Sequence, residues 1–186
     1  MKNLKIKGTS ECLSKCFSAE TNLSTFMCPN ECKRLCKATE DSFGLLKYYG
    51  LNSSEISFCE NNKVKCLNAY KLSWDAEKLC LKIYSNSRVN DENDACRHYV
   101  WSILMAKDLG TDVAESILTA HEDNPQEPIN EKAMDLANNR LGLIQYSKFK
   151  NKEITSEDIL TSFKEQMKKD KFIMLKPRYR SQGGLP

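Results

Sequence analysis

The sequence predicts an all-α protein, a compact helical domain with a disulfide-stapled N-terminal helical hairpin. Three observations support this fold class. Apolar residues recur at helical spacing along most of the chain, whereas the alternation typical of strands is hard to find. The nine cysteines are spaced rather than scattered. The 186 residues, 40% of them apolar, with 7 Gly and 5 Pro, suit one core and exclude collagen-like or linker-rich chains.

The first predicted element is a Cys-rich helical hairpin over residues 1–41. Its cysteines include pairs four residues apart, and such pairs share one face of a helix. Two such helices facing each other bring the sulfurs within bridging reach. We therefore expect disulfides between Cys16 and Cys28 and between Cys12 and Cys32, with zinc binding by the same cysteines as the alternative.

The other five cysteines have less definite partners. Cys59 and Cys66 could close a small loop by a disulfide. Cys80 and Cys96 remain as disulfide partners or free thiols, and Cys36 is left for a partner more distant in the sequence. Because the count is odd, at least one thiol is unpaired or intermolecular. This heavy use of cysteine favours an oxidising compartment, so we expect a secreted or periplasmic protein. The Lys-rich start lacks the apolar stretch of a signal peptide, and export would require its earlier removal.

The helical domain, expected to be catalytic, covers residues 42–175, and turn and capping signals divide it. Before a polar loop at 85–93, we expect helices over 42–49, from Ser53 or Ser54 onward, and over 64–84. After the loop, Asp91 or Asp94 caps a helix over about 95–109 that ends at Gly110.

Three further helices complete the domain. Asp112 and Glu115 form a capping-box signature for a helix over about 113–122, which the Asn and Pro residues at 124–128 terminate. The next helices are expected over about 130–146 and, after a cap at Thr155 or Ser156, up to about residue 171.

The only two histidines, His98 and His121, are expected to lie together. They stand 12 residues before and 11 residues after Gly110, so a turn there that folds the helices back on each other brings both rings to one end. Each shares its helix face with apolar residues, which directs both rings inward or into a cleft. A satisfied core histidine is the alternative for either ring alone, but two beside Glu122 favour a functional site.

Three sequence blocks in this region resemble a known family. They are Arg97-His98 before an aromatic-rich stretch, Ala120-His121-Glu122, and Met134-Asp135-Leu136-x-Asn138-Asn139-x-x-Gly142. In this order they are similar to an uncharacterised bacterial domain found in secreted proteins and polymorphic toxins, over about a quarter of the chain. The resemblance implies a shared site at Arg97, His98, His121, Glu122, Asp135, Asn138 and Asn139. Ala137 stands where we would expect a polar residue, often His, which weakens any mechanism with a third imidazole.

A weaker likeness connects the chain with lysozyme-like transglycosylases. Those enzymes place the catalytic Glu at a helix end and carry Gly-Leu-Met-Gln further along. Here Glu122 ends a predicted helix, and Gly142-Leu143-Ile144-Gln145 follows within the next one. A carboxyl group of raised pKa beside an apolar wall would suit cleavage of a sugar polymer.

The expected function is that of a secreted hydrolase or lyase that targets the cell envelope, most of all the glycan of peptidoglycan. Glu122 is the expected general acid or base, with a raised pKa if the cleft is apolar, and His98 and His121 tune or share the proton transfer. The expected substrate-binding residues are Arg97, Asp135, Asn138 and Asn139. No cofactor is expected.

Two other functions stay open. In the first, His98, His121 and a carboxylate from Glu122 or Asp135 bind zinc or another divalent ion, giving a metal-dependent hydrolase or toxin that acts on lipid or nucleic acid. No HExxH or comparable spacing supports this set. In the second, the chain is a disulfide-stabilised, non-catalytic helical module that binds an envelope polymer or a partner protein.

A basic tail over residues 176–186 ends the chain. The net charge is +3, but residues 148–180 hold ten Lys or Arg against five Asp or Glu. Such a region could bind a cell-wall polymer or another anionic envelope component, and a solvated helix face with a frayed end is the alternative. An immunity or partner protein is a further expected partner. The sequence contains no run of 18 apolar residues, so no transmembrane segment is predicted.

Overall fold

A computed structural model describes residues 51–186 except 87, 150–152, 180–183 and 186. Across these residues the chain forms six helices and no strand, which confirms the all-α class. The predicted hairpin over 1–41, its four bridging cysteines and the predicted helix over 42–49 lie outside the described residues. No helix of the described part has the length and apolar character needed to cross a membrane.

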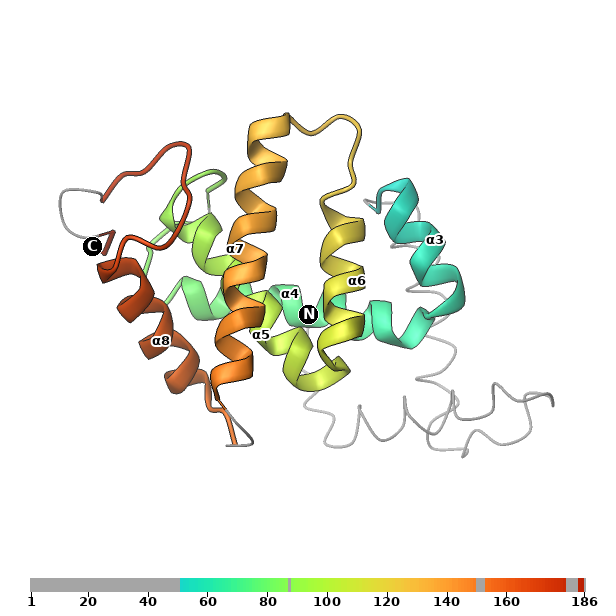
Figure 1. The fold of residues 1–186 in the computed structure, drawn as a ribbon, viewed down its shortest axis with the longest axis horizontal. Helices are drawn as coiled ribbons and strands as arrows, with labels where there is room; N and C mark the ends of the chain where they lie inside the picture. The colour runs from blue at the N-terminus through green and yellow to red at the C-terminus, as the bar shows by residue number, and fades with distance from the viewer. Residues whose placement is uncertain (1–50, 87, 150–152, 180–183, 186) are drawn as a thin grey trace, which may run out of the picture.

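The helices follow the predicted order, with ends that differ by a few residues. They are α3 (Ser53–Asn61), α4 (Lys63–Cys80), α5 (Glu92–Leu109), α6 (Thr111–His121), α7 (Ile129–Lys148) and α8 (Ser156–Lys168). α5 is the central helix, because it contacts α4, α6, α7 and α8. In Figure 1, α6 and α7 stand side by side, with α3 beyond α6 and α8 beyond α7.

Local sequence explains where α5 begins and ends. The Asp91 side chain caps the helix by accepting the backbone N–H of Asn93 at 2.9 Å. Gly110 ends it with a φ of 85°, a left-handed value that favours glycine. The predicted capping box of Asp112 and Glu115 does not form, because α6 begins at Thr111, immediately after Gly110, and takes both residues into its interior.

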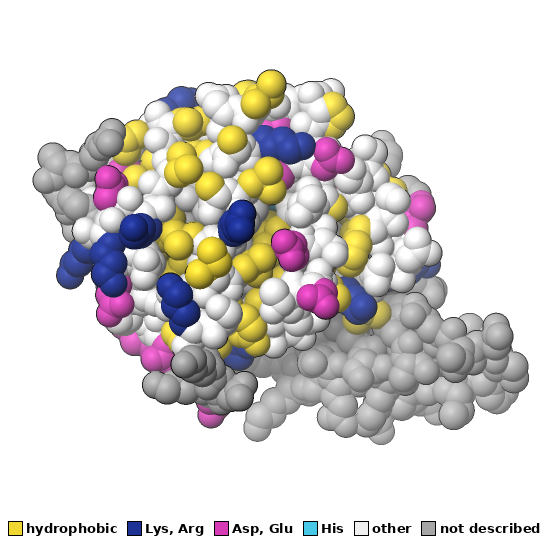
Figure 2. All heavy atoms as spheres, in the orientation of Figure 1, with side chains coloured by type: hydrophobic (Ala, Val, Ile, Leu, Met, Phe, Trp, Pro, Cys, Tyr) yellow, Lys and Arg dark blue, Asp and Glu magenta, His cyan; other side chains and the backbone are white. Residues whose placement is uncertain are grey.

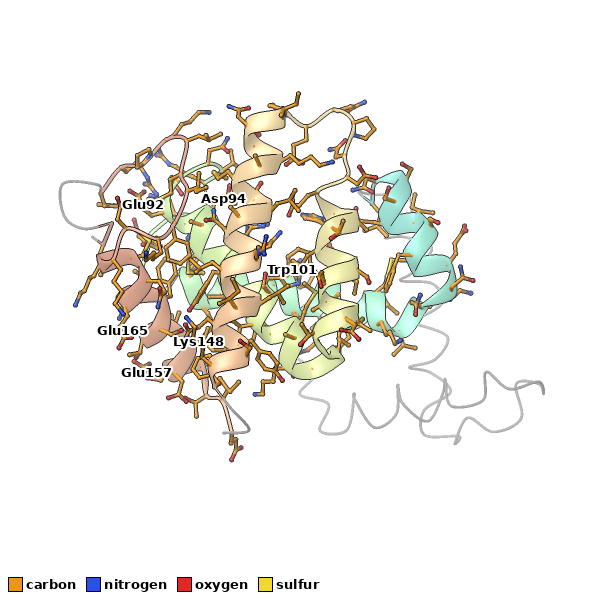
Figure 3. The ribbon with its side chains drawn as sticks, viewed as in Figure 1. Glu92, Asp94, Trp101, Lys148, Glu157 and Glu165 are labelled. Atoms are coloured by element: carbon orange, nitrogen blue, oxygen red, sulfur yellow. A yellow bond between two sulfur atoms is a disulfide. The ribbon has the colours of Figure 1, made fainter. Side chains whose placement is uncertain are left out.

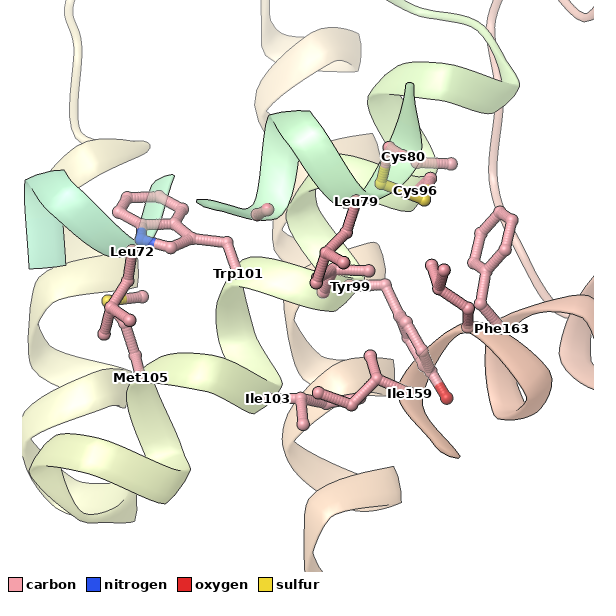
Figure 4. Packing of buried hydrophobic residues seen from close by; sticks show 14 of the residues in the cluster. Leu72, Leu79, Cys80, Cys96, Tyr99, Trp101, Ile103, Met105, Ile159 and Phe163 are labelled. Carbon is pink, nitrogen blue, oxygen red and sulfur yellow. A yellow bond between two sulfur atoms is a disulfide. The ribbon is translucent and has the colours of Figure 1, made fainter. Parts of the chain in front are cut away.

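The core lies on both sides of α5 (Figure 4). Tyr99 and Ile103 face α8, where Phe163 lies with its ring centroid 5.9 Å from that of Tyr99. Trp101 and Met105 lie on the α4 side, and the Trp101 indole N–H donates to the Ala69 carbonyl at 2.9 Å. Burial of such large side chains on two sides fixes α5 as the rigid element that carries the site.

Within the described residues, two disulfides join consecutive helices. Cys59–Cys66 joins α3 to α4, which confirms the predicted small loop, and Cys80–Cys96 joins α4 to α5. Both bonds are buried. They are compatible with an extracellular protein, because disulfides persist mainly in oxidising compartments.

Gly142 allows α7 to pack directly against α5. A Cβ atom at this position would lie 2.5 Å from the carbonyl oxygen of Tyr99 and 2.8 Å from the Cβ of Ser102. Only glycine therefore fits at this helix crossing. Residues 142–145 lie within α7 as predicted, and the glycine that begins them has a packing reason of its own.

Residues 172–179, here called the C-terminal strap, cross the start of α5 after α8 ends. The backbone N–H groups of Leu175 and Lys176 donate to the Asn90 carbonyl at 3.0 and 2.8 Å. Those of Arg178 and Tyr179 donate to Oε1 of Glu92 at 2.7 and 2.6 Å. The described part of the predicted tail is thus held against α5 and is not frayed. Figure 2 shows Lys and Arg side chains beside Asp and Glu over the neighbouring α8 region.

Candidate functional site

The two histidines lie together, as the helix geometry predicts. The ring centroids of His98 on α5 and His121 on α6 are 6.4 Å apart. Beside them is a pocket of about 160 Å³, here called the polar pocket, between α5, the α6–α7 loop and α7. Its acidic lining residues are Asp94, Glu122, Glu127, Glu131 and Asp135.

His98 is buried among the carboxyl groups of Asp94, Glu122 and Asp135. These four residues, with Arg97 and Asn139, are here called the His98 cluster. Its Nε2 lies 3.3 Å from Oδ1 of Asp135 and 3.5 Å from Oδ1 of Asp94, and its Nδ1 lies 3.4 Å from Oε1 of Glu122. Burial lowers the pKa of His98, and the charge of Arg97 lowers it as well. The contacts with the carboxyl groups outweigh both effects and raise the pKa to about 9, which favours the cation although Nη2 of Arg97 lies 3.0 Å from Nε2.

Asp94 is the carboxylate on α5 itself. Its Oδ1 accepts from Arg97 at 2.5 Å, and its Oδ2 accepts the backbone N–H of Asn90 at 2.6 Å. Burial raises the pKa of Asp94, but the contacts with His98, Arg97 and the Asn90 N–H hold it well below its usual range. Asp94 is therefore ionised, and it positions both Arg97 and His98.

Glu122 follows the last residue of α6, and its side chain is only 2% exposed. Its Oε1 accepts from Nδ2 of Asn139 at 2.7 Å. Burial raises the pKa of Glu122, but the contact with His98, the electrostatic interactions with both histidines and the Asn139 hydrogen bond lower it below its usual value. The raised pKa that an apolar cleft would give Glu122 is not found, because this cleft is polar and buried donors surround the carboxylate.

Asp135 on α7 behaves in the opposite way. The residue is 6% exposed, and its Oδ1 accepts no hydrogen bond from any residue that the structure describes. Burial raises its pKa, the negative charges of Asp94 and Glu122 raise it further, and His98 and Arg97 oppose them, with a result of about 7.

The charges of the cluster explain this difference. Two cations, Arg97 and His98, balance two ionised carboxylates, Asp94 and Glu122. Ionisation of Asp135 would leave a buried excess negative charge, which is unfavourable. Asp135 therefore holds a proton near neutral pH, and it is the group best placed to exchange it.

His121 lies at the rim of this cluster. Its Nδ1 is 2.7 Å from Oε1 of Glu55 on α3, and the Trp101 ring meets it edge-on with centroids 5.0 Å apart. Figure 3 labels Asp94 near the start of α5 and Trp101 further along that helix. Asn52 ties α3 to the end of α6 by donating to the carbonyls of Ala120 and His121, at 2.8 Å each. His121 thus connects the polar pocket with α3.

The two asparagines on α7 have different surroundings. Oδ1 of Asn139 lies 3.1 Å from Nδ1 of His98 inside the cluster. The Asn138 side chain instead accepts from the N–H of Ile173 at 3.1 Å and donates to its carbonyl at 2.9 Å, so it holds the strap. The role of either in substrate binding stays a prediction.

Besides Val89, three polar pocket residues come from positions that the sequence patterns did not single out. Asn90, Glu127 and Glu131 line the pocket, and the first two lie in loops. Burial raises the pKa of Glu127, and the charge of Glu122 raises it further. Loops lack hydrophobic periodicity, so the only signal for these residues was their position between the helices that bear the blocks.

Two overlapping sets of side chains have the spacing to hold a metal ion. The ligand atoms of Asp94, His98 and Asp135 lie within 4.8 Å of one another, and so do those of Glu122, Glu127 and Asp135. Oε2 of Glu127 is buried without a hydrogen-bond partner among the described residues. The second set consists of oxygen ligands alone, which hard divalent cations such as Ca²⁺ and Mg²⁺ prefer.

Comparison with known proteins gives one match. The model of a family described as a domain of unknown function (DUF6973) matches residues 56–171, more than half of the chain, and the matched region contains every residue of the His98 cluster. No curated protein and no solved structure matches the sequence.

Proposed function

The chain belongs to the DUF6973 family, and we propose that it is a secreted hydrolase or lyase of the cell envelope that cleaves the glycan of peptidoglycan by general acid–base chemistry. The observation that carries the proposal is the carboxyl pair Asp135 and Glu122. The pKa of Asp135 is raised to about 7, while that of Glu122 is lowered. Two carboxyl groups whose pKa values are driven apart are the arrangement that glycosidases use for their acid and their ionised partner.

The separation of the pair supports a particular stereochemistry. Carboxyl oxygens of Glu122 and Asp135 lie within 4.8 Å of each other. Inverting glycosidases hold their carboxyl groups about 6.5–9.5 Å apart to admit a water molecule, whereas retaining enzymes hold them about 5–5.5 Å apart. We therefore propose cleavage with retention of configuration at the anomeric carbon.

In this mechanism Asp135 donates its proton to the glycosidic oxygen as the bond to the anomeric carbon breaks. Glu122 faces the positive charge that develops on the sugar and either forms the glycosyl intermediate or stabilises the cation. Asp135 then accepts a proton from the attacking water or, in a lyase, the sugar's own hydroxyl group attacks. His98 keeps Glu122 ionised, and Arg97, held by Asp94, orients the substrate.

The charge of the pocket supports a neutral glycan over a polyanion. Five acidic side chains line it against one arginine and two histidines. Phosphodiester substrates would meet this acidic excess, so nucleic acid is disfavoured. We further propose that the chain is related to secreted toxins or to lysozyme-like enzymes and that it is secreted. The two described disulfides support secretion.

The test is digestion of purified peptidoglycan, followed by mass spectrometry of the soluble fragments. We expect glycan fragments with reducing or anhydro-sugar ends, released by the parent protein and not by Asp135→Asn. Fragments cut only in the peptide, or no fragments at all, would contradict glycan cleavage.

A metal-dependent hydrolase is the second candidate, favoured by the set Glu122, Glu127 and Asp135. Elemental analysis of the purified protein and titration with Ca²⁺, Mg²⁺ and Zn²⁺ would distinguish it. Activity that is lost with a chelator and restored by one ion would establish the metal, whereas the acid–base proposal expects the same rate with the chelator present.

A further inference from the structure

A second cavity of about 180 Å³, here called the apolar pocket, lies beside the polar pocket between α3, α4, α5 and α6. Its lining is mostly hydrophobic and includes Phe58, Tyr70, Trp101, Ile117 and the Cys59–Cys66 disulfide. An apolar cavity of this kind excludes water and accepts apolar groups. It thus has the character of a binding pocket for a chain or ring without polar atoms.

The apolar pocket and the polar pocket are continuous in their lining. Arg97 and His121 line both, so the two cavities are adjacent, and a ligand that occupies both must pass these two side chains. The proposed reacting groups lie at one end of this path, and Trp101 lies at the other.

The walls of the apolar pocket are held firmly. The disulfide fixes α3 to α4, and the Trp101 indole is hydrogen-bonded to the Ala69 carbonyl on α4 at 2.9 Å. The Glu55 to His121 contact, at 2.7 Å, ties α3 to α6. Because these contacts join all four helices, the cavity does not depend on one loose side chain, and a ligand would meet a preformed site.

From this shared lining we propose that the site also accepts an amphipathic substrate: a neutral sugar in the polar pocket that carries an alkyl or acyl chain in the apolar pocket. The acidic lining of the polar pocket disfavours an anionic head, and the apolar lining selects a hydrocarbon chain. This inference rests on the proposed function for the identity of the head, but the apolar pocket itself is tested by binding alone.

The binding test uses full-length protein and two probes that share one sugar, octyl β-D-glucoside below its micelle concentration and methyl β-D-glucoside. The chain has two tryptophans, and Trp74, which is 58% exposed, is replaced by Phe so that the fluorescence reports on Trp101. We expect the octyl compound to change this fluorescence at concentrations at which the methyl compound does not. Affinity should rise about four-fold for each methylene that enters the pocket, or about 15-fold from hexyl to octyl glucoside.

A matched pair of variants on α6 locates the binding. Ala120 is partly buried and lines the apolar pocket, whereas its neighbour Thr119 is exposed and does not. Ala120→Phe should weaken octyl glucoside binding at least ten-fold, and Thr119→Phe should leave it within two-fold. Ser73→Phe, from α4, gives a second block if Ala120→Phe does not fold.

The outcomes separate the two proposals. Equal binding of octyl and methyl glucoside, or unchanged octyl binding in a folded blocking variant, would overturn the amphipathic substrate. Octyl glucoside binding that Ala120→Phe removes, together with an absence of peptidoglycan cleavage, would support the apolar pocket while contradicting the proposed function. Turnover that is faster on an alkylated glycoside than on its methyl counterpart, together with cleavage of peptidoglycan, would support both.

Discussion

The first turns of α5 carry two buried polar clusters with different character. In the strap cluster, Glu92 accepts two backbone N–H groups, and Asp91 lies 2.6 Å from the guanidinium of Arg178. In the His98 cluster, Asp135 faces a pocket and two further carboxyl groups, and its Oδ1, like Oδ2 of Asp91 and Oε2 of Glu92, accepts no hydrogen bond from the described residues. Donors that are supplied by the chain itself turn buried carboxylates into anchors. An excess of carboxyl groups over donors instead leaves one that holds a proton.

In the strap cluster, the hydroxyl group of Tyr84 keeps its proton, unlike the carboxyl group of Asp135. Burial raises the pKa of its hydroxyl well above the usual range, and the nearby charges of Glu92 and Asp91 raise it further. The hydroxyl therefore stays neutral and donates to the Gly184 carbonyl at 2.7 Å. The hydrogen bonds of Tyr84 and Glu92 hold the strap, so we assign this cluster a structural role.

The largest expected effect is on turnover. Asp135→Asn keeps the shape of the protonated side chain and removes the proton, so the rate of glycan cleavage should fall about 100-fold or more. The unfolding midpoint should not fall, because the variant removes no hydrogen bond that Oδ1 accepts. Asp112→Asn, at an exposed position of α6, is the control and should retain the parental rate. A folded Asp135→Asn with more than about a tenth of the parental rate would remove Asp135 from the mechanism.

The second effect is on stability and belongs to the strap cluster. Glu92→Ala leaves the N–H groups of Arg178 and Tyr179 without their acceptor, so the free energy of unfolding should fall by about 2–4 kcal/mol. Urea denaturation measures this loss. Glu115→Ala, on the exposed side of α6, should change it by less than about 0.5 kcal/mol. Equal stability of the two variants would show that the strap contributes nothing to the fold.

The third effect is on pH dependence, where the His98 cluster should dominate. Cleavage requires protonated Asp135, whose pKa is about 7, so kcat/KM should decline by about ten-fold for each pH unit above 7. The acidic limb should follow Glu122, whose pKa is lowered, and so lie below the ordinary range of a glutamate. A profile that is flat from pH 6 to 9 would contradict this assignment.

Stability should follow the same groups with a calculable sign. The folded state holds the Asp135 proton up to about pH 7, whereas an unfolded aspartate loses it near its ordinary value, so this contribution to stability declines as the pH rises between them. Because the pKa of His98 is raised, its protonation stabilises the fold at low pH. This contribution to stability is lost as the pH rises through about 9. The pKa values of Asp94 and Glu122 are lowered in the fold. Both groups therefore stabilise the fold at a pH above their ordinary pKa values, and this contribution is lost as the pH falls. Thermal melts of the parent and Asp135→Asn should therefore differ in slope mainly between pH 4 and 7.

Helices and their order follow from sequence, because apolar periodicity and capping are local. The meeting of His98 and His121 was also predictable, since it needs only the helical rise and the turn at Gly110. The protonated state of Asp135 could not be predicted from the sequence. It arises when α7 packs on α5 and brings a third carboxyl group to a site where the charges already balance, and no local pattern encodes that balance. The strap was missed for a related reason, because its contacts are made by backbone groups, whose partners a sequence does not identify.

The smallest expected effect concerns Asn90, which connects the two clusters. Its backbone N–H donates to Asp94 at 2.6 Å, and its carbonyl accepts from the strap. It adopts a φ of 71°, which glycine tolerates and which costs a residue with a Cβ about 1–2 kcal/mol. Asn90→Gly keeps both backbone contacts and loses only the side-chain hydrogen bond to Glu131, at 2.8 Å, so stability should change by less than about 1 kcal/mol. Asn90→Ala loses the same bond without the backbone freedom of glycine, and it should be less stable than Asn90→Gly by about 1 kcal/mol. Urea denaturation of both variants measures the difference, and an alanine variant as stable as the glycine variant would show that the left-handed backbone is not required to hold the two clusters together.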